Sequence, residues 1–226
     1  MQGYPYRRVA AASILRAFSN QKGARIMPNP TTLRNLSGLP AAPAALAESA
    51  LVLIDCQNTY RDGVMALSGV EGALDEAAAV LARARRLGVP VIHIQHDAGP
   101  GSPYDVRASI GAIADKVAPA AGEAVIVKHF PNSFVGTELE AQLKATGRKN
   151  VVFVGFMTHM CVNSTTRGAF NLGFAPTVVA SATATRDLAD PQGNLVPAAT
   201  LQAASLAALG DLFAVVVPDA AALPDA

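Results

Sequence analysis

From residue 50 onward the chain repeats one pattern, in which an amphipathic stretch ends near a glycine and a short apolar run follows. The apolar runs are rich in Val, Ile, Leu and Phe and barely alternate with polar residues, which is typical of parallel strands buried on both faces. Glycine just past a helix permits the left-handed conformation that ends many helices. The pattern therefore predicts alternating strands and helices. The expected strands span residues 50–55, 89–95, 124–129, 150–156, 175–181 and 212–217.

Helices are expected between these strands. The stretch 72–87 carries an apolar stripe at helical spacing, with Leu74, Leu81 and Leu87 on one face. Another helix is expected to begin at Thr137, because Thr137 and Glu140 have the spacing of a capping box. This alternation predicts an α/β fold, namely a three-layer αβα sandwich with a parallel six-stranded sheet.

The first part of the chain lacks the pattern. It is rich in Pro, Ala, Ser and Asn, and so we expect an irregular N-terminal extension over residues 1–47 and one folded domain over 48–226. Residues 1–26 contain five basic residues and no acidic one, a composition that resembles a transit peptide. Two other interpretations stay open: Met27 is the true start of the chain, or the segment is a flexible tail.

Composition narrows the class of protein. An apolar fraction of 51% with 15% charged residues predicts a globular chain, and no apolar run approaches the roughly 20 residues that span a bilayer. Beyond the basic start acidic residues are in excess, so neither a nucleic acid nor a membrane is expected as a partner. With two cysteines and no secretory signal pattern, we expect no disulfide framework and a cytoplasmic location.

Titratable residues follow the predicted strands at the edge where parallel strands end and ligands bind. Asp55 follows the first strand, Lys128 ends the third and Cys161 follows the fourth. We expect Cys161 at the start of a helix, where the helix dipole lowers the pKa of a thiol. Asp55 would then act as the base, and the ammonium of Lys128 would stabilise negative charge.

Each of these residues also has a structural interpretation. Asp55 would be a turn former, Lys128 a solvated strand end and Cys161 an inert buried thiol. Cys56 is expected to be a core thiol on the opposite face from Asp55, and His93 a core residue.

Neither a metal site nor a cofactor is expected. The four histidines show no spacing typical of metal ligands, and no glycine pattern typical of a nucleotide site is present.

Three segments together resemble the isochorismatase-like cysteine hydrolases: VLIDCQN, VIVKHFPNSFVGTEL and GFMTHMCVNSTTRGAFNLGF. The resemblance covers residues 48–217. It implies a parallel six-stranded sheet and a catalytic triad of Asp55, Lys128 and Cys161.

The resemblance also implies two backbone features near the cysteine. One is a cis peptide bond between Phe156 and Met157, and the other is an oxyanion hole formed by the N–H groups of Met157 and Cys161. Further residues are expected to line the substrate pocket: Gln57, His96, Tyr104, Phe134 and His159.

By the same resemblance, the expected activity is hydrolysis of a C–N bond in a small amide, carbamoyl or imide-like substrate through a thioester at Cys161. The segment HIQHDAGPGSPYDV lacks the zinc-binding pattern of nicotinamidases, which favours a hydrolase without a metal. Two alternatives stay open: a vinyl ether hydrolase of the isochorismatase type, in which the cysteine is dispensable, and a non-catalytic or redox protein. The family implies a homodimer or homotetramer.

Overall fold

The computed structural model describes residues 30–226. The expectations for residues 1–26 and for Met27 lie outside the described residues.

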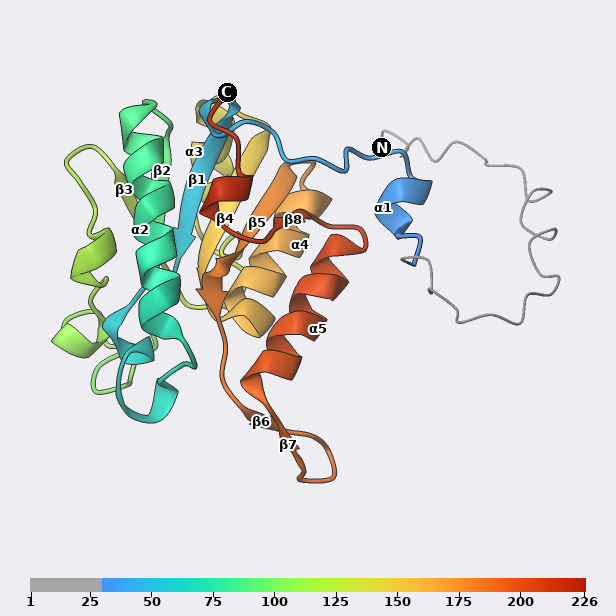
Figure 1. Ribbon diagram of the computed structural model, residues 1–226. Coiled ribbons are helices and arrows are strands. Elements are labelled where there is room, and N and C mark those ends of the chain that lie inside the picture. The colour runs from blue at the N-terminus through green and yellow to red at the C-terminus, as the bar shows by residue number, and fades with distance from the viewer. Residues whose placement is uncertain (1–29) are drawn as a thin grey trace, which may run out of the picture.

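Six parallel strands form the central sheet, which confirms the predicted fold class (Figure 1). Along the sheet they are ordered β3-β2-β1-β4-β5-β8. Each strand overlaps its predicted range. Their bounds are β1 (Ser49–Ile54), β2 (Val91–His96), β3 (Ala124–Lys128), β4 (Asn150–Phe156), β5 (Ala175–Ala184) and β8 (Val215–Val217).

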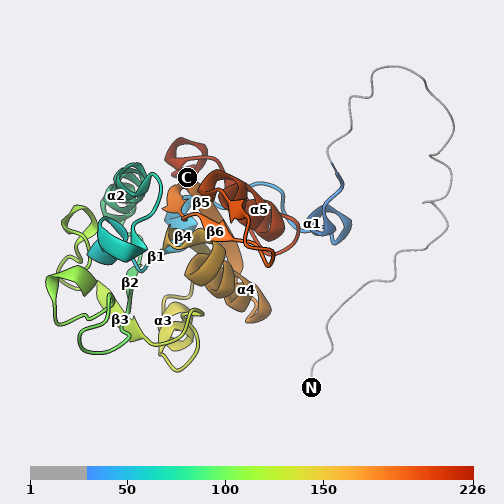
Figure 2. The ribbon, with the colours of Figure 1, turned by 90° about the horizontal axis from the view of Figure 1, so that it is seen from below.

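Helices cover both faces of this sheet, as Figure 2 shows in a view along the strands. On one face, α2 packs on alternate strand residues such as Leu51 and Leu53, and on the other the remaining long helices pack on Val52 and Ile54. Successive side chains along each strand point to opposite faces of the sheet, so each strand contributes to two separate hydrophobic cores. The four longer helices of residues 30–226 are α2 (Val70–Arg86), α3 (Leu139–Ala145), α4 (Asn163–Asn171) and α5 (Ala198–Gly210).

Shorter elements connect these parts. A hairpin formed by β6 (Leu188–Ala189) and β7 (Leu195–Val196) projects below α5 in Figure 1, and a π-helical turn covers Thr158–Val162. Within the described residues, the short helices are α1 (Leu33–Leu36) and six 3₁₀ turns at Leu46–Glu48, Asn58–Tyr60, Gly63–Met65, Ser109–Gly111, Asp115–Val117 and Ala220–Ala222. No helix within residues 30–226 is both long enough and apolar enough to cross a membrane.

The helix after β3 begins later than expected. It starts at Leu139, with Glu138 as its N-cap. The hydroxyl of Thr137 donates to the carbonyl of Ser133 at 2.5 Å and accepts from the N–H of Leu139 at 3.3 Å, and Glu140 pairs with Lys144 at 2.6 Å. Because both side chains have other partners, the predicted capping box is wrong.

Part of the N-terminal extension packs on the body. The guanidinium of Arg34 donates from Nε to the carbonyl of Pro40 and from Nη1 to that of Leu212, at 2.7 and 3.1 Å. The N–H of Leu46 donates to the carbonyl of Pro224 at 2.8 Å, and Leu46 is fully buried. These contacts tie the chain before β1 to the C-terminal part of the domain.

The strand order also locates a crevice. After β1 the chain adds β2 and β3 on one side, then crosses over to place β4 on the other side of β1. In open α/β sheets such a switch point opens a crevice at the carboxyl ends of the two strands concerned, where ligands bind. Here those are the ends of β1 and β4, which Asp55 and Cys161 follow.

Candidate active site

Asp55 lies directly after β1 in a left-handed backbone conformation, with φ of 50°. It is the one non-glycine residue with positive φ in residues 30–226. Asp tolerates this conformation better than most residues, although it still costs about 1 kcal/mol or more. The side chain is fully buried. The turn places the carboxylate just beyond the carboxyl end of β1, which lies next to β4 in the sheet.

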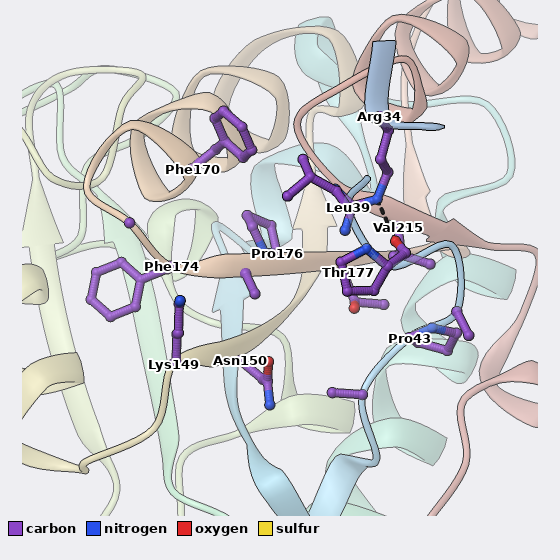
Figure 3. A pocket seen from close by; sticks show the side chains of 15 residues that line it. Arg34, Leu39, Pro43, Lys149, Asn150, Phe170, Phe174, Pro176, Thr177 and Val215 are labelled. Carbon is purple, nitrogen blue, oxygen red and sulfur yellow. Dashed lines mark hydrogen bonds between the residues drawn. The ribbon is translucent and has the colours of Figure 1, made fainter. Parts of the chain in front are cut away.

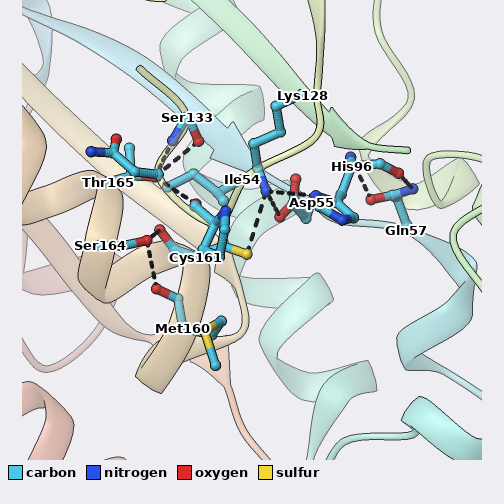
Figure 4. A network of polar contacts seen from close by, with 12 residues as sticks. Ile54, Asp55, Gln57, His96, Lys128, Ser133, Met160, Cys161, Ser164 and Thr165 are labelled. Carbon is cyan, nitrogen blue, oxygen red and sulfur yellow. Dashed lines mark hydrogen bonds and ion pairs between the residues drawn. The ribbon is translucent and has the colours of Figure 1, made fainter. Parts of the chain in front are cut away.

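Lys128 is the last residue of β3 and is also fully buried. Its Nζ lies 2.8 Å from Oδ2 of Asp55 and 3.4 Å from Sγ of Cys161 (Figure 4). The structure therefore brings the three residues of the expected triad together around one ammonium group.

Cys161 lies in the π-helical turn, two residues before α4 begins at Asn163. The carbonyl of Met157 accepts from the N–H groups of Met160 and Val162 at 3.0 and 3.2 Å. These two bonds flank Cys161 and involve neither its N–H nor its thiol. The expectation that Cys161 lies at the start of a helix is confirmed, although this first turn is π-helical rather than α-helical. Such π turns occur often at functional sites.

The electrostatics of the thiol also differ from expectation. Burial and the neighbouring Asp55 carboxylate raise the pKa of the Cys161 thiol to about 12, and Lys128 only partly opposes them. Cys161 is 5% exposed, so desolvation outweighs any effect of a helix terminus. The predicted lowering of this pKa is wrong, and the raised pKa favours the protonated thiol.

Asp55 can accept that proton. Burial raises the pKa of the Asp55 carboxyl, and the Lys128 ammonium opposes this shift. A carboxylate with a raised pKa is a stronger base than an ordinary one, which narrows the pKa gap to the thiol. Both of its oxygens are buried and make no hydrogen bond within residues 30–226, and Oδ2 forms the ion pair with Lys128. The arrangement is chemically able to move a proton from sulfur to carboxylate.

The peptide bond between Phe156 and Met157 is cis. Phe156 is fully buried and packs edge-on against Tyr60, with ring centroids 5.6 Å apart. Met157 follows at the start of the turn that carries Cys161. The oxyanion hole formed by the N–H groups of Met157 and Cys161 stays a prediction.

Gln57 does not line a pocket, because its side chain is fully buried. Its Nε2 donates to the carbonyls of His96 and Gly111 at 2.9 and 2.7 Å, and its Oε1 accepts from the N–H of His96 at 2.9 Å. Every polar atom of the amide thus binds backbone. These contacts do not support the predicted substrate-binding role of Gln57, whose amide instead holds the end of β2 in place.

Three other expected pocket residues lie near the strand ends. His96 Nδ1 is 3.2 Å from Nζ of Lys128, and the ring of Tyr104 packs edge-on against the His96 ring at 5.1 Å. His159, two residues before Cys161, shares a 2.6 Å hydrogen bond between its Nδ1 and Oγ1 of Thr185. Burial lowers the pKa of His159, and the charge of Arg186 adds to the shift.

Phe134 packs elsewhere. Its ring stacks on that of Phe174, with centroids 6.2 Å apart. Phe174 immediately precedes β5 and lines a cavity of ≈ 560 Å³ at the amino-terminal edge of the sheet, with Lys149 and Pro176 (Figure 3). Because Phe134 contacts a residue of the opposite edge, its predicted role in substrate binding is not supported by its position.

Two further residues lie near the site. Tyr60 is 1% exposed and packs between Phe156 and Tyr104, with ring centroids 5.6 and 5.8 Å away. It lies in a 3₁₀ turn with no motif that would have indicated it. Arg186 follows β5, and its Nε is buried without a hydrogen bond in the described part of the chain. Its position shortly after a predicted strand is the sequence feature that places it at this edge of the sheet.

Within residues 30–226 there is no group of three or more His, Cys, Asp and Glu side chains arranged to hold a metal ion. Activity without a metal stays a prediction, as does activity without a cofactor.

Comparison with known proteins agrees with this architecture. Residues 49–221 match the family model of the isochorismatase domain. The chain is 32% identical over 188 residues to a secreted isochorismatase effector of Verticillium dahliae, covering 83% of this chain and 96% of the relative. It is 31% identical to a ureidoacrylate amidohydrolase of Stutzerimonas stutzeri, covering 64% of this chain and 75% of the relative.

A crystal structure of an isochorismatase from Pseudomonas putida KT2440 superimposes with a TM-score of 0.82 at 38% sequence identity, covering 85% of this chain and 98% of that one. The fold, the matched domain and these relatives agree with one another. The chain belongs to the isochorismatase-like family of hydrolases.

Proposed function

We propose that the protein hydrolyses a C–N bond in a small amide, carbamoyl or imide-like substrate through a thioester at Cys161. One observation carries the proposal: Lys128 Nζ contacts both the carboxylate of Asp55 and the sulfur of Cys161, at 2.8 and 3.4 Å. A base, a nucleophile and a positive charge within one buried cluster suit acyl transfer. The relative named as an amidohydrolase supports the same class of reaction.

In the first half of the reaction, the thiol proton moves to Asp55 while sulfur attacks the carbonyl carbon. A C–S bond forms, the carbonyl oxygen becomes an oxyanion, and the N–H groups of Met157 and Cys161 stabilise that charge. The C–N bond then breaks, and Asp55 returns its proton to the leaving nitrogen. The amine or ammonia departs, and a thioester remains on Cys161.

In the second half, a water molecule gives its proton to Asp55 and attacks the thioester carbon. The C–S bond breaks, the acid product leaves, and the proton on Asp55 returns to sulfur. Throughout, the ammonium of Lys128 stabilises the negative charge that moves between carboxylate and sulfur. Its burial strengthens this effect because little water screens the charges.

A panel of small amides, ureas and imides, with isochorismate included, tests the proposed reaction. Product detection by mass spectrometry should show a C–N cleavage product that Cys161→Ala does not form. Cleavage of isochorismate alone, at a similar rate in the wild type and Cys161→Ala, would favour the vinyl ether hydrolase.

Assembly and location are part of the proposal. A homodimer or homotetramer is expected, and light scattering on the purified protein measures it; a monomer at micromolar concentration would contradict it. The cytoplasmic location stays a prediction from the two cysteines, and fractionation of the native cells tests it.

A further inference from the structure

The side chain of Lys128 must cross the end of β2 to reach the other triad residues. β3 is an edge strand, and β2 lies between it and β1. Two strand spacings separate β3 from β1, roughly 10 Å. His96, the last residue of β2, is paired with Lys128 in the register of the two strands, and paired residues point to the same face. The imidazole of His96 therefore lies along the path of the lysine.

The ammonium of Lys128 has three N–H donors and three neighbours that can accept. These are Oδ2 of Asp55 at 2.8 Å, Sγ of Cys161 at 3.4 Å and Nδ1 of His96 at 3.2 Å (Figure 4). Lys128 is fully buried, and a buried donor without an acceptor is costly. His96 supplies the third acceptor, provided that its Nδ1 carries no proton.

The surroundings hold the His96 ring in place and neutral. Gln57 binds both the N–H and the carbonyl of His96 at 2.9 Å, and Tyr104 packs edge-on against the ring. Burial, with the charges of Lys128 and His129, lowers the pKa of His96 to about 4, and Asp97 only partly opposes them. A neutral imidazole with a free Nδ1 carries its one proton on Nε2.

We propose that His96 is a positioning residue, which accepts one N–H of Lys128 at Nδ1 and so directs the other two toward Asp55 and Cys161. His96 then acts through the lysine rather than by binding substrate. Its effect on turnover rests on the proposed hydrolase function, whereas its effect on the free thiol does not.

The tautomer of His96 is the first test. Long-range ¹⁵N–¹H spectra of the uniformly ¹⁵N-labelled protein at pH 7, with His96→Asn used for assignment, report which ring nitrogen carries the proton. The expected result is a neutral ring protonated at Nε2. A proton on Nδ1, in either the neutral or the charged ring, overturns the proposal.

A matched pair of variants is the second test. His96→Asn keeps an acceptor where Nδ1 lies, whereas His96→Leu has a similar shape without one. Alkylation of Cys161 by iodoacetamide, followed on its peptide by mass spectrometry, should slow on the order of tenfold in His96→Leu. His96→Asn should restore most of the rate. Cys56, 1% exposed in the other core, serves as an internal control because only unfolding would label it.

With a turned-over amide, His96→Leu should lower kcat by a similar factor and leave KM within about twofold, and His96→Asn should recover kcat. Equal alkylation rates in the two variants overturn the proposal, as does a rise in KM alone, since that would make His96 a substrate-binding residue. If no amide is hydrolysed by the wild type, the hydrolase function fails, and the tautomer and the alkylation rates still decide the role of His96.

Discussion

Gly155 of β4 packs directly on the backbone of Ile54 in β1, so closely that a Cβ on Gly155 would lie 2.0 Å from the carbonyl oxygen of Ile54. Its φ of 116° is also outside the range of other residues. Ile54 immediately precedes Asp55, and Gly155 begins the segment that leads to Cys161. This contact therefore sets how closely the two strand ends that hold the base and the nucleophile approach each other.

Gly155→Ala should destabilise the protein by more than about 3 kcal/mol, because both the backbone conformation and the contact with β1 are lost. Urea unfolding measures this change. Gly122→Ala is the matched control, since Gly122 also has a positive φ, 88°, but nothing lies within 4 Å of its added Cβ. It should cost only about 1 kcal/mol. Equal losses in the two variants would show that the contact with Ile54 is unimportant.

Lys128→Met should abolish activity and also destabilise the protein by about 3–5 kcal/mol, because it leaves the buried Asp55 carboxylate without its partner. The double variant Asp55→Asn with Lys128→Met should recover part of that stability and none of the activity. Urea unfolding and product assays on both proteins check this. If the double variant were less stable than Lys128→Met, the ion pair would not be the source of the effect.

The stability of the protein should fall as the pH falls from about 6.5 to about 4. The pKa of His96 is lowered by burial from 6.5 to about 4, and so over this range the unfolded chain binds a proton that the folded protein does not. Unfolding then takes up protons, and the free energy of unfolding decreases with decreasing pH. In His96→Asn this decrease should be smaller. An identical pH dependence in both proteins would contradict a half-buried histidine that is neutral in the folded protein.

Removal of metals should leave activity unchanged. The prediction rests on the absence of metal-ligand spacings in the sequence, and prolonged dialysis against a strong chelator followed by assay tests it. Loss of stoichiometric zinc together with activity, both restored by adding zinc, would overturn it.

The strands could be predicted because each is a strong local signal. Runs such as the one ending at Ile54 are apolar throughout, and buried parallel strands need that composition. The same apolar runs predicted that Asp55, Lys128 and Cys161 lie close together, because each follows or ends a strand and the carboxyl ends of parallel strands share one edge of the sheet. The hairpin of β6 and β7 escaped prediction because each of its strands has only two residues.

The errors concern properties that distant residues decide. The side-chain amide of Gln57 donates hydrogen bonds to the carbonyls of His96 and Gly111, which lie 39 and 54 residues away in the sequence. The pKa of Cys161 depends on how deeply the finished fold buries the sulfur, and local helix position gives no measure of that. Thr137 is a local exception, because its hydroxyl donates to the carbonyl of Ser133 and accepts from the N–H of Leu139, a pattern that differs from a capping box. A pattern along the chain indicates where a polar side chain lies, but not which groups it contacts in the folded protein.

The thioester on Cys161 is the central claim, and trapping it is the most direct measurement. An amide that the protein turns over, quenched in acid during the steady state and digested, should yield the Cys161 peptide with the mass of the acyl group added. Asp55→Asn should give no such adduct, because no carboxylate is then left beside Cys161 to accept the thiol proton. Absence of the adduct in the wild type, together with turnover by Cys161→Ala at much of the wild-type rate, would contradict the thioester mechanism.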